Sequence, residues 1–142
     1  SLYEWLIEMY VEHTYFKESL ITLTKKGQQG EEEIKTMMEN FRNNHPEKIN
    51  GLNVTRMLDY LTLTETDLKT GKKIPLNFST SDVLQFYLED GTKVSVRPSG
   101  TEPKIKFYIS VNAPLKSNVE FEIVSQELDT KIKGIEQYLL KG

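Results

Sequence analysis

Three stretches between residues 84 and 111 alternate apolar and polar side chains, and this alternation constrains the fold more than any other feature of the sequence. Successive side chains of a strand point to opposite faces, so each stretch is predicted to be a half-buried β-strand. Asp90-Gly91 predicts a hairpin with a type I′ turn, in which both central residues have positive φ. The three strands therefore form an antiparallel sheet whose apolar face must be covered by helices. The apolar positions are Leu84, Phe86, Leu88, Val94, Val96, Ile105, Phe107, Ile109 and Val111.

Two other segments have the period of an amphipathic helix and are predicted to cover this face. The first begins with Glu31–Glu33, because negative charge is favourable in the first turn of a helix, and it ends before Pro46. The second begins with a capping box formed by Ser117 and Glu120 and continues through Leu139. Their apolar stripes are Ile34, Met37, Met38 and Phe41 in the first helix, and Phe121, Val124, Leu128, Ile132, Ile135 and Leu139 in the second.

The remaining segments complete an α+β fold. Residues 1–13 have helical spacing and predict a lead-in helix, whereas residues 15–24 are rich in β-branched and aromatic side chains and predict a strand. Residues 53–63 predict a further strand, which a charged turn at residues 69–73 follows. The predicted order is helix, strand, helix, four strands and helix. This order describes one antiparallel sheet with two helices packed against one face, preceded by the lead-in helix.

Length and composition exclude several classes of protein. The 142 residues are enough for one domain, and the absence of cysteine excludes disulfides, thiolate metal sites and a cysteine nucleophile. The two histidines, His13 and His45, are too far apart in sequence to suggest a metal centre. The net charge of −3 argues against a general nucleic-acid binder, and no apolar run reaches the ~18–20 residues that cross a membrane. We expect a cytoplasmic protein and, because the chain starts inside a helical pattern without methionine, part of a longer one.

The connection between the last two predicted strands, residues 97–103, is the main candidate for a binding site. Its sequence is Arg-Pro-Ser-Gly-Thr-Glu-Pro. Arg97 has a planar, permanently charged guanidinium that can donate two hydrogen bonds to one phosphate. Ser99 and Thr101 supply hydroxyl donors, and Gly100 permits positive φ, so that successive backbone amides can converge on an anion.

The residues around this loop allow two interpretations. The two prolines of the loop restrict its unbound conformations, which lowers the cost of ordering it on binding, and Lys104 and Lys106 add positive charge on the polar face of the sheet. Glu102 would repel a phosphate, so we expect its side chain to turn away and to pair with a neighbouring Lys or Arg or with backbone amides. In the alternative interpretation the loop is an ordinary turn, and Glu102 is the ion-pair partner of a surface Arg97.

The segment Arg97–Tyr108 resembles the C-terminal phosphate-binding loop of the α-D-phosphohexomutases, the phosphoglucomutase/phosphomannomutase family. The preceding hairpin and the helix-strand-helix pattern of residues 1–44 are also similar to that family, so the resemblance covers essentially the whole chain. It implies a TATA-binding-protein-like topology of strand, helix, four strands and helix over residues 15–142. Residues 1–14 would then be the lead-in helix and hinge at the end of a preceding domain.

The resemblance also implies a function. Such enzymes move a phosphoryl group between the 1- and 6-hydroxyls of a hexose, with Mg²⁺ and a phosphoserine that belong to the preceding domains. The C-terminal domain holds the phosphate that is not transferred, binds no cofactor or metal itself and contributes no catalytic residue in this chain, which alone is expected to be inactive. Arg97, Ser99, Gly100 and Thr101 would contact that phosphate, with Lys104 as a weaker contact. The implied partners are hexose 1-phosphate, hexose 6-phosphate, the bisphosphate intermediate and the other domains of the enzyme.

Two functions of other classes compete with this one. A protein-interaction module would need an apolar patch on the open face of the sheet, where Lys93, Ser95 and Arg97 instead make the surface polar. A single-stranded nucleic-acid binder would use Tyr87 and Tyr108 as stacking platforms.

Overall fold

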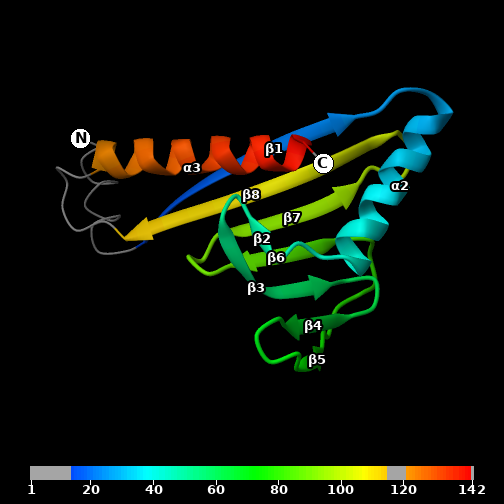
Figure 1. The fold of residues 1–142 in the computed structure, drawn as a ribbon, viewed down its shortest axis with the longest axis horizontal. Coiled ribbons are helices and arrows are strands. Elements are labelled where there is room, and N and C mark those ends of the chain that lie inside the picture. Colours follow the sequence, from blue (N-terminus) through cyan, green and yellow to red (C-terminus); the bar gives the residue numbers. More distant parts are fainter. Residues whose placement is uncertain (1–13, 115–120, 142) are drawn as a thin grey trace.

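The computed structural model describes residues 14–114 and 121–141, which form two helices and an eight-stranded antiparallel sheet (Figure 1). The helices are α2 (Gly27–Asn43) and α3 (Phe121–Lys141). The strands are β1 (Thr14–Thr24), β2 (Lys48–Ile49), β3 (Leu52–Asp59), β4 (Thr64–Asp67), β5 (Lys73–Pro75), β6 (Leu84–Leu88), β7 (Lys93–Pro98) and β8 (Lys104–Pro114). The α+β class is confirmed. The predicted lead-in helix over residues 1–13 and the predicted capping box at Ser117 and Glu120 lie outside the described residues.

The strands of the sheet follow the order β1-β8-β7-β6-β3-β4-β5, and β2 pairs with β3 beside this path. The longest ladder joins β1 to β8 in antiparallel register, from Thr14 opposite Pro114 to Thr24 opposite Lys104. β6, β7 and β8 are consecutive hairpin neighbours, as their alternating sequence predicts. The predicted strand over residues 15–24 is confirmed as β1, which lies at the opposite edge of the sheet from β5.

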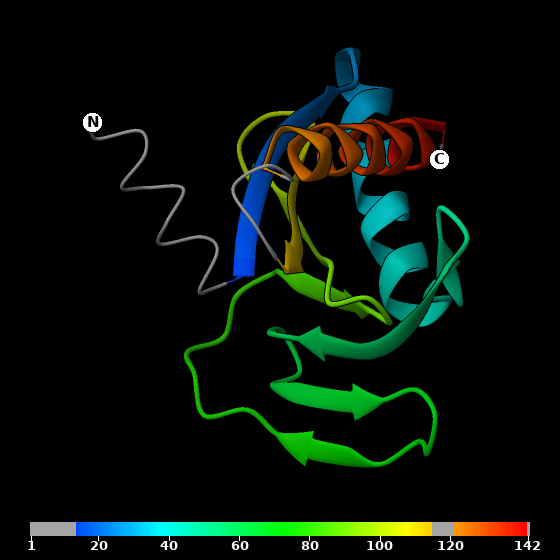
Figure 2. The same ribbon diagram turned by 90° about the vertical axis from the view of Figure 1, so that its left-hand side faces the viewer.

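Both helices cover the same face of the sheet, as Figures 1 and 2 show, while β4 and β5 extend beyond them. α3 packs against β8 and β1, and α2 packs against β7 and β8. The apolar side of the alternation is buried between these layers, so the predicted buried face of the sheet is confirmed, whereas Met37, Phe41 and Val124 of the predicted helical stripes are only partly buried. The buried residues of the core are Ile34, Met38, Ile49, Val54, Met57, Leu84, Phe86, Leu88, Val94, Val96, Ile105, Phe107, Ile109, Val111, Leu128, Ile132, Ile135 and Leu139.

α2 begins one turn earlier than predicted. Its first residue is Gly27, which has φ of +75° and reverses the chain after β1, so Glu31–Glu33 lie beyond the first turn. The prediction that these glutamates start the helix is therefore wrong. Negative charge near a helix N-terminus contributes only ~0.3–1 kcal/mol, which is too little to set the start when a glycine has already turned the chain.

Seven strands, rather than four, separate α2 from α3. The strand predicted over residues 53–63 ends at Asp59, whose carboxylate accepts hydrogen bonds from the amides of Leu61 and Thr62 and closes a turn. β4 and β5 follow, and β2 precedes β3 through a two-residue loop, Asn50-Gly51. Both loop residues have positive φ, of 50° and 83°, as a type I′ turn requires. Asn-Gly is the strongest short hairpin signal in a sequence, so Asn50-Gly51 indicates this turn from the sequence alone.

The turn between β6 and β7 differs from the type I′ turn predicted for it. The amide of Gly91 donates to the carbonyl of Leu88, so Glu89 and Asp90 are the central residues of the turn. Only Gly91 has positive φ, of 89°, and the amide of Leu88 donates to the carbonyl of Thr92. This is a three-residue hairpin loop with glycine in the left-handed position. The prediction of a hairpin at this place is confirmed, and the predicted turn type is wrong.

Candidate functional site

The predicted phosphate-binding loop is a tight connection of five residues, Ser99–Pro103, between β7 and β8. The amide of Ser99 donates to the carbonyl of Lys104 (2.9 Å) and closes the base of the hairpin, and the amide of Lys104 donates to the carbonyl of Glu102 (2.7 Å). Gly100 has φ of +86°, a conformation that only glycine adopts at little cost. Because the amide of Ser99 is occupied, an anion-binding role of the backbone falls to Gly100 and Thr101. Their amides have no protein acceptor in the part of the chain that the structure describes.

Arg97 is exposed on the sheet face that the helices leave open. Its neighbours along β7 on the other face, including Val96, are buried in the core. In the register of β7 and β8, Arg97 lies directly opposite Lys106. Among residues 14–114 and 121–141, no carboxylate forms an ion pair with either cation. Like charges directly opposite each other destabilise a sheet, and a bound anion would relieve this repulsion.

Lys106 is a candidate contact that the sequence analysis treats only as added positive charge. Its position opposite Arg97 follows from counting outward from the loop, because Ser99 and Lys104 close the hairpin and each further step pairs the next two residues. The length of the loop therefore predicts that Lys106 lies opposite Arg97, but only once Ser99 and Lys104 are known to be the pair that closes the hairpin.

Lys104 behaves differently from the other predicted contacts. Its ammonium forms an ion pair with Glu102 (2.7 Å). The hydrogen bond from Lys104, together with the charges of Lys104 and Lys106, lowers the pKa of the Glu102 carboxyl below its usual value. The prediction that Glu102 pairs with a neighbouring lysine is confirmed. The alternative pairing of Glu102 with Arg97 does not occur, and Lys104 is partly neutralised before any ligand arrives.

A cavity of about 390 Å³ lies between the loop and α2. It is bordered by Gly100, Thr101 and Glu102 of the loop, and its charged lining is mainly acidic. The carboxylates are Glu31, Glu39, Asp82 and Glu102, whereas Arg42, one of two cations there, is already paired with Asp59 and Asp82. The charge of this cavity disfavours an anion, whereas Arg97 and Lys106 place positive charge on the open face of the sheet.

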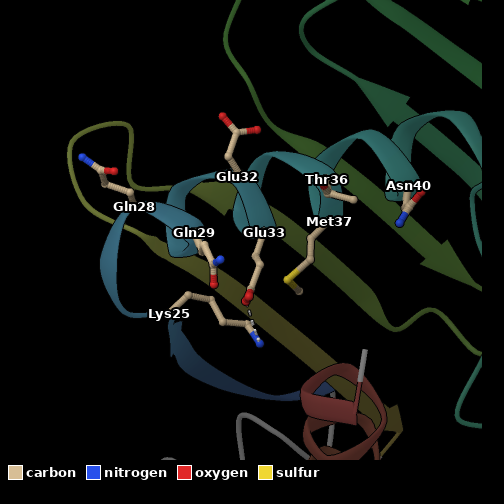
Figure 3. A pocket seen from close by; sticks show the side chains of 8 residues that line it. All are labelled: Lys25, Gln28, Gln29, Glu32, Glu33, Thr36, Met37 and Asn40. Atoms are coloured by element: carbon tan, nitrogen blue, oxygen red, sulfur yellow. Dashed lines mark ion pairs between the residues drawn. The ribbon is translucent and has the colours of Figure 1, made fainter.

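A second cavity, of about 650 Å³, lies on another side of α2 and is lined by none of the loop residues. Figure 3 shows its polar side chains, among which Lys25 forms an ion pair with Glu33 (3.6 Å). The remaining lining residues are Gln28, Gln29, Glu32, Thr36, Met37 and Asn40. This cavity has amide and hydroxyl groups but no clustered cations, so its size does not make it the phosphate site.

The open face also carries an apolar strip that the sequence analysis did not predict. Phe16 and Leu20 of β1 are 56% and 53% exposed, and Leu20 lies directly opposite Tyr108, which is 41% exposed. The other candidate stacking ring, Tyr87, is covered by the guanidinium of Arg56, which lies 4.3 Å from the ring centroid. The face is therefore cationic near the loop and partly apolar across β1 and β8.

Residues 14–114 and 121–141 contain no group of three or more His, Asp or Glu side chains placed to hold a metal ion. These residues therefore do not fit a site for Mg²⁺. Within the same residues, neither helix has the length and apolar character needed to cross a membrane.

Comparisons with known proteins agree with this geometry. Residues 33–114 match the family described as phosphoglucomutase/phosphomannomutase, C-terminal domain. The chain is 35% identical over 116 residues to a phosphoglucomutase of Staphylococcus aureus (strain N315), covering 82% of the chain and 20% of that relative. It is 31% identical over 134 residues to a phosphoglucomutase of Staphylococcus haemolyticus, covering 94% of the chain and 23% of the relative. The chain thus spans about a fifth of the length of these curated relatives. It belongs to the family of phosphoglucomutase/phosphomannomutase C-terminal domains.

Proposed function

We propose that this chain is the phosphate-clamping domain of a phosphohexomutase. The observation that carries the proposal is the pair of cations Arg97 and Lys106, which have no ion-pair partner among residues 14–114 and 121–141, beside a loop in which the amides of Gly100 and Thr101 have no protein acceptor in those residues. The guanidinium of Arg97 would donate two hydrogen bonds to the phosphate, and the hydroxyls of Ser99 and Thr101 and the amides of Gly100 and Thr101 would complete the contacts. Lys104, held by Glu102, would contribute mainly through its charge.

The clamp would act on the phosphate that does not react. A hexose 1- or 6-phosphate, or the bisphosphate between them, presents such a phosphate in either orientation. Binding energy from this remote group positions the reacting group against the rest of the enzyme. The phosphoserine donor and Mg²⁺ would be supplied by other parts of a longer polypeptide, in keeping with relatives of which the match covers only 20% and 23%. Residues 1–14 would form the connection to those parts, and residues 15–142 the clamping domain.

We also propose that the enzyme acts in the cytoplasm. The chain has no cysteine and therefore needs no oxidising compartment for disulfide formation.

The two competing functions fit the geometry less well. Nucleic-acid stacking would need two open rings, and Arg56 covers one of them. A pure interaction module would leave the unpaired Arg97 and Lys106 without a role, although the apolar strip on β1 and β8 is available for contacts with other domains of the same enzyme.

Replacing Arg97 in the complete enzyme tests the proposal. We expect Arg97→Ala to lower kcat/KM for hexose phosphate by about 10- to 150-fold, because removing a charged hydrogen-bond donor costs ~1.5–3 kcal/mol. Lys93→Ala is the matched control, since Lys93 is a cation on the same strand but at the opposite end from the loop. An unchanged kcat/KM for Arg97→Ala, measured beside that control, would refute the clamp.

A further inference from the structure

The phosphate-binding loop has one anchor outside its own hairpin. Beyond the ladder that joins Thr24 to Lys104, the amide of Lys25 donates to the carbonyl of Pro103 at 2.8 Å. Within the ranges 14–114 and 121–141, no other hydrogen bond reaches residues 99–103 from outside β7 and β8. The position of the loop relative to the sheet therefore depends on where the Lys25 backbone lies.

The position of Lys25 depends in turn on a glycine in α2. Gly30 is buried, and a Cβ at this residue would lie 2.9 Å from the carbonyl carbon of Lys25, 3.0 Å from its Cβ and 3.1 Å from its carbonyl oxygen. Cβ atoms do not approach backbone atoms this closely, so a side chain at position 30 would displace Lys25 or shift the helix. Figure 3 shows Lys25 beside the first turns of α2.

A glycine inside a helix lowers its stability, so the presence of Gly30 in α2 needs a structural reason. Gly is about 1 kcal/mol less favourable than Ala in a helix interior, and Gly30 has no positive φ that would explain its presence. The close approach of α2 to the Lys25 backbone does explain it. The same turn is further tied to the helix by the ion pair between Lys25 and Glu33.

We infer that Gly30 is a positioning residue of the phosphate clamp, acting through the Lys25 amide on the Pro103 carbonyl. The inference rests on the proposed function, because it assigns Gly30 a role in the same site. Gly30 itself touches no ligand. It lets α2 hold Lys25 where its amide fixes the end of the loop, so that the amides of Gly100 and Thr101 are ordered before phosphate binds. Ordering a loop in advance lowers the cost of binding.

Two matched pairs of variants separate this role from general stability. Gly30→Ala raises helix propensity but crowds Lys25, whereas Thr36→Ala raises helix propensity at an exposed position of the same helix. Lys25→Pro removes the amide donor, whereas Lys25→Ala keeps the amide and removes only the ammonium. Inorganic phosphate is titrated into each variant of the 142-residue chain, with the amide shifts of Gly100 and Thr101 followed by NMR, and with hydrogen exchange of residue 25 followed in the variants that keep its amide. The melting temperature of each variant is recorded as well.

Gly30→Ala and Lys25→Pro are expected to bind phosphate about 3- to 10-fold more weakly, the effect of losing one backbone hydrogen bond. Thr36→Ala and Lys25→Ala should bind as the parent does. In Gly30→Ala the amide of Lys25 should exchange faster, and the ligand-free shifts of Gly100 and Thr101 should move, which a uniform loss of stability would not cause. Should Gly30→Ala fail to fold, the Lys25→Pro and Lys25→Ala pair decides the question by itself.

The possible negative results have different meanings. If the parent binds phosphate but Lys25→Pro and any folded Gly30→Ala bind equally well, the positioning role is wrong and the proposed function stands. If the amides of Gly100 and Thr101 in the parent do not shift even at the highest soluble phosphate concentration, the proposed function is wrong and the positioning role falls with it.

Discussion

At the scale of single residues, the loop combines groups that a phosphate needs with one group that opposes it. Arg97 and Lys106 are unpaired, and Gly100 has φ of +86° with open space around it, so its role is conformational and not steric. Glu102 is the opposing group. Its carboxylate pairs with Lys104 and so neutralises part of the positive charge that surrounds the site. In the proposed clamp, the affinity for phosphate would therefore be set by a balance between three cations and one anion.

Replacing Glu102 by glutamine tests this balance. Glu102→Gln removes the negative charge and releases Lys104, so phosphate should bind about 2- to 4-fold more tightly, the range of exposed ion pairs. The difference should shrink at high salt, because exposed charges are screened. Titration calorimetry with inorganic phosphate at two ionic strengths measures both effects, with Glu127→Gln on the exposed side of α3 as control. Equal or weaker binding by Glu102→Gln would show that the carboxylate supports the loop rather than opposing the ligand.

At the scale of elements, ion pairs and hydrogen bonds join the helices to the sheet and add directional contacts to the apolar packing between them. Arg42 of α2 donates to Asp59 at the end of β3 (2.9 Å) and to Asp82 before β6 (2.7 Å). At the other side of the layer, Asp90 in the β6–β7 turn accepts hydrogen bonds from the ammonium of Lys131 in α3 and from the amide of Thr92. These contacts fix α2 relative to the end of β3 and the start of β6, and α3 relative to the β6–β7 turn.

The ion pair between Asp90 in the β6–β7 turn and Lys131 in α3 should be lost in acid. Burial raises the pKa of the Asp90 carboxyl, but the hydrogen bonds from Lys131 and Thr92 outweigh burial, so that the pKa lies below its usual value. The stabilisation is therefore complete above the unfolded-state pKa of ~3.9 and disappears as the pH falls through the lower folded-state value. Asp90→Asn should be about 1 kcal/mol less stable than the parent at pH 7, with the gap closing below about pH 4.

Urea unfolding of both proteins between pH 7 and pH 2.5 measures this gap, and Glu127→Gln again serves as the control for removing one negative charge. A gap that stays constant across the whole range would mean that Asp90 stabilises the turn through its shape and not through its charge.

At the scale of the whole molecule, cations gather on the open face near the loop and carboxylates gather beside α2, although Glu18 of β1 also lies on the open face. The chain has a net charge of −3, yet Lys93, Arg97 and Lys106 share the open face of the sheet, while Glu31, Glu39 and Asp82 border the cavity beside α2. The alternation of each strand produces this sorting, because apolar side chains on one face leave polar ones on the other. A negatively charged protein can thus present a local attraction for phosphate.

The proposed division of labour predicts that the 142-residue chain binds ligand without turning it over. Because the proposed function leaves the phosphoserine and Mg²⁺ to other parts of a longer polypeptide, glucose 1-phosphate should bind weakly to this chain and should not be converted to glucose 6-phosphate. A coupled assay for glucose 6-phosphate, run beside a binding titration, checks both parts. Arg97→Ala serves as the control against a contaminating enzyme. Turnover that this variant abolishes would show that the chain contains a catalytic centre of its own.

The predictions from the sequence succeeded where a local pattern governs structure. The period-two alternation predicted β6, β7, β8 and their buried face, and the helical stripes predicted α2 and α3. Glu102 was correctly expected to find a lysine. The short strands β2, β4 and β5 were missed because two to four residues carry too little periodicity, and the start of α2 was misplaced because a favourable charge pattern was weighted above a glycine that turns the chain.

The sequence by itself determined the class of the fold, the apolar core and the loop that is chemically equipped for phosphate, because each depends on residues close together along the chain. Only the tertiary structure decided what surrounds that loop. The pairing of Arg97 with Lys106 across two strands, the acidic cavity beside α2, and the contact between Gly30 and Lys25 that anchors Pro103 depend on register and helix placement. Those are settled by packing of the whole core, and a shift of one residue in strand register would turn Arg97 or Lys106 to the other face of the sheet.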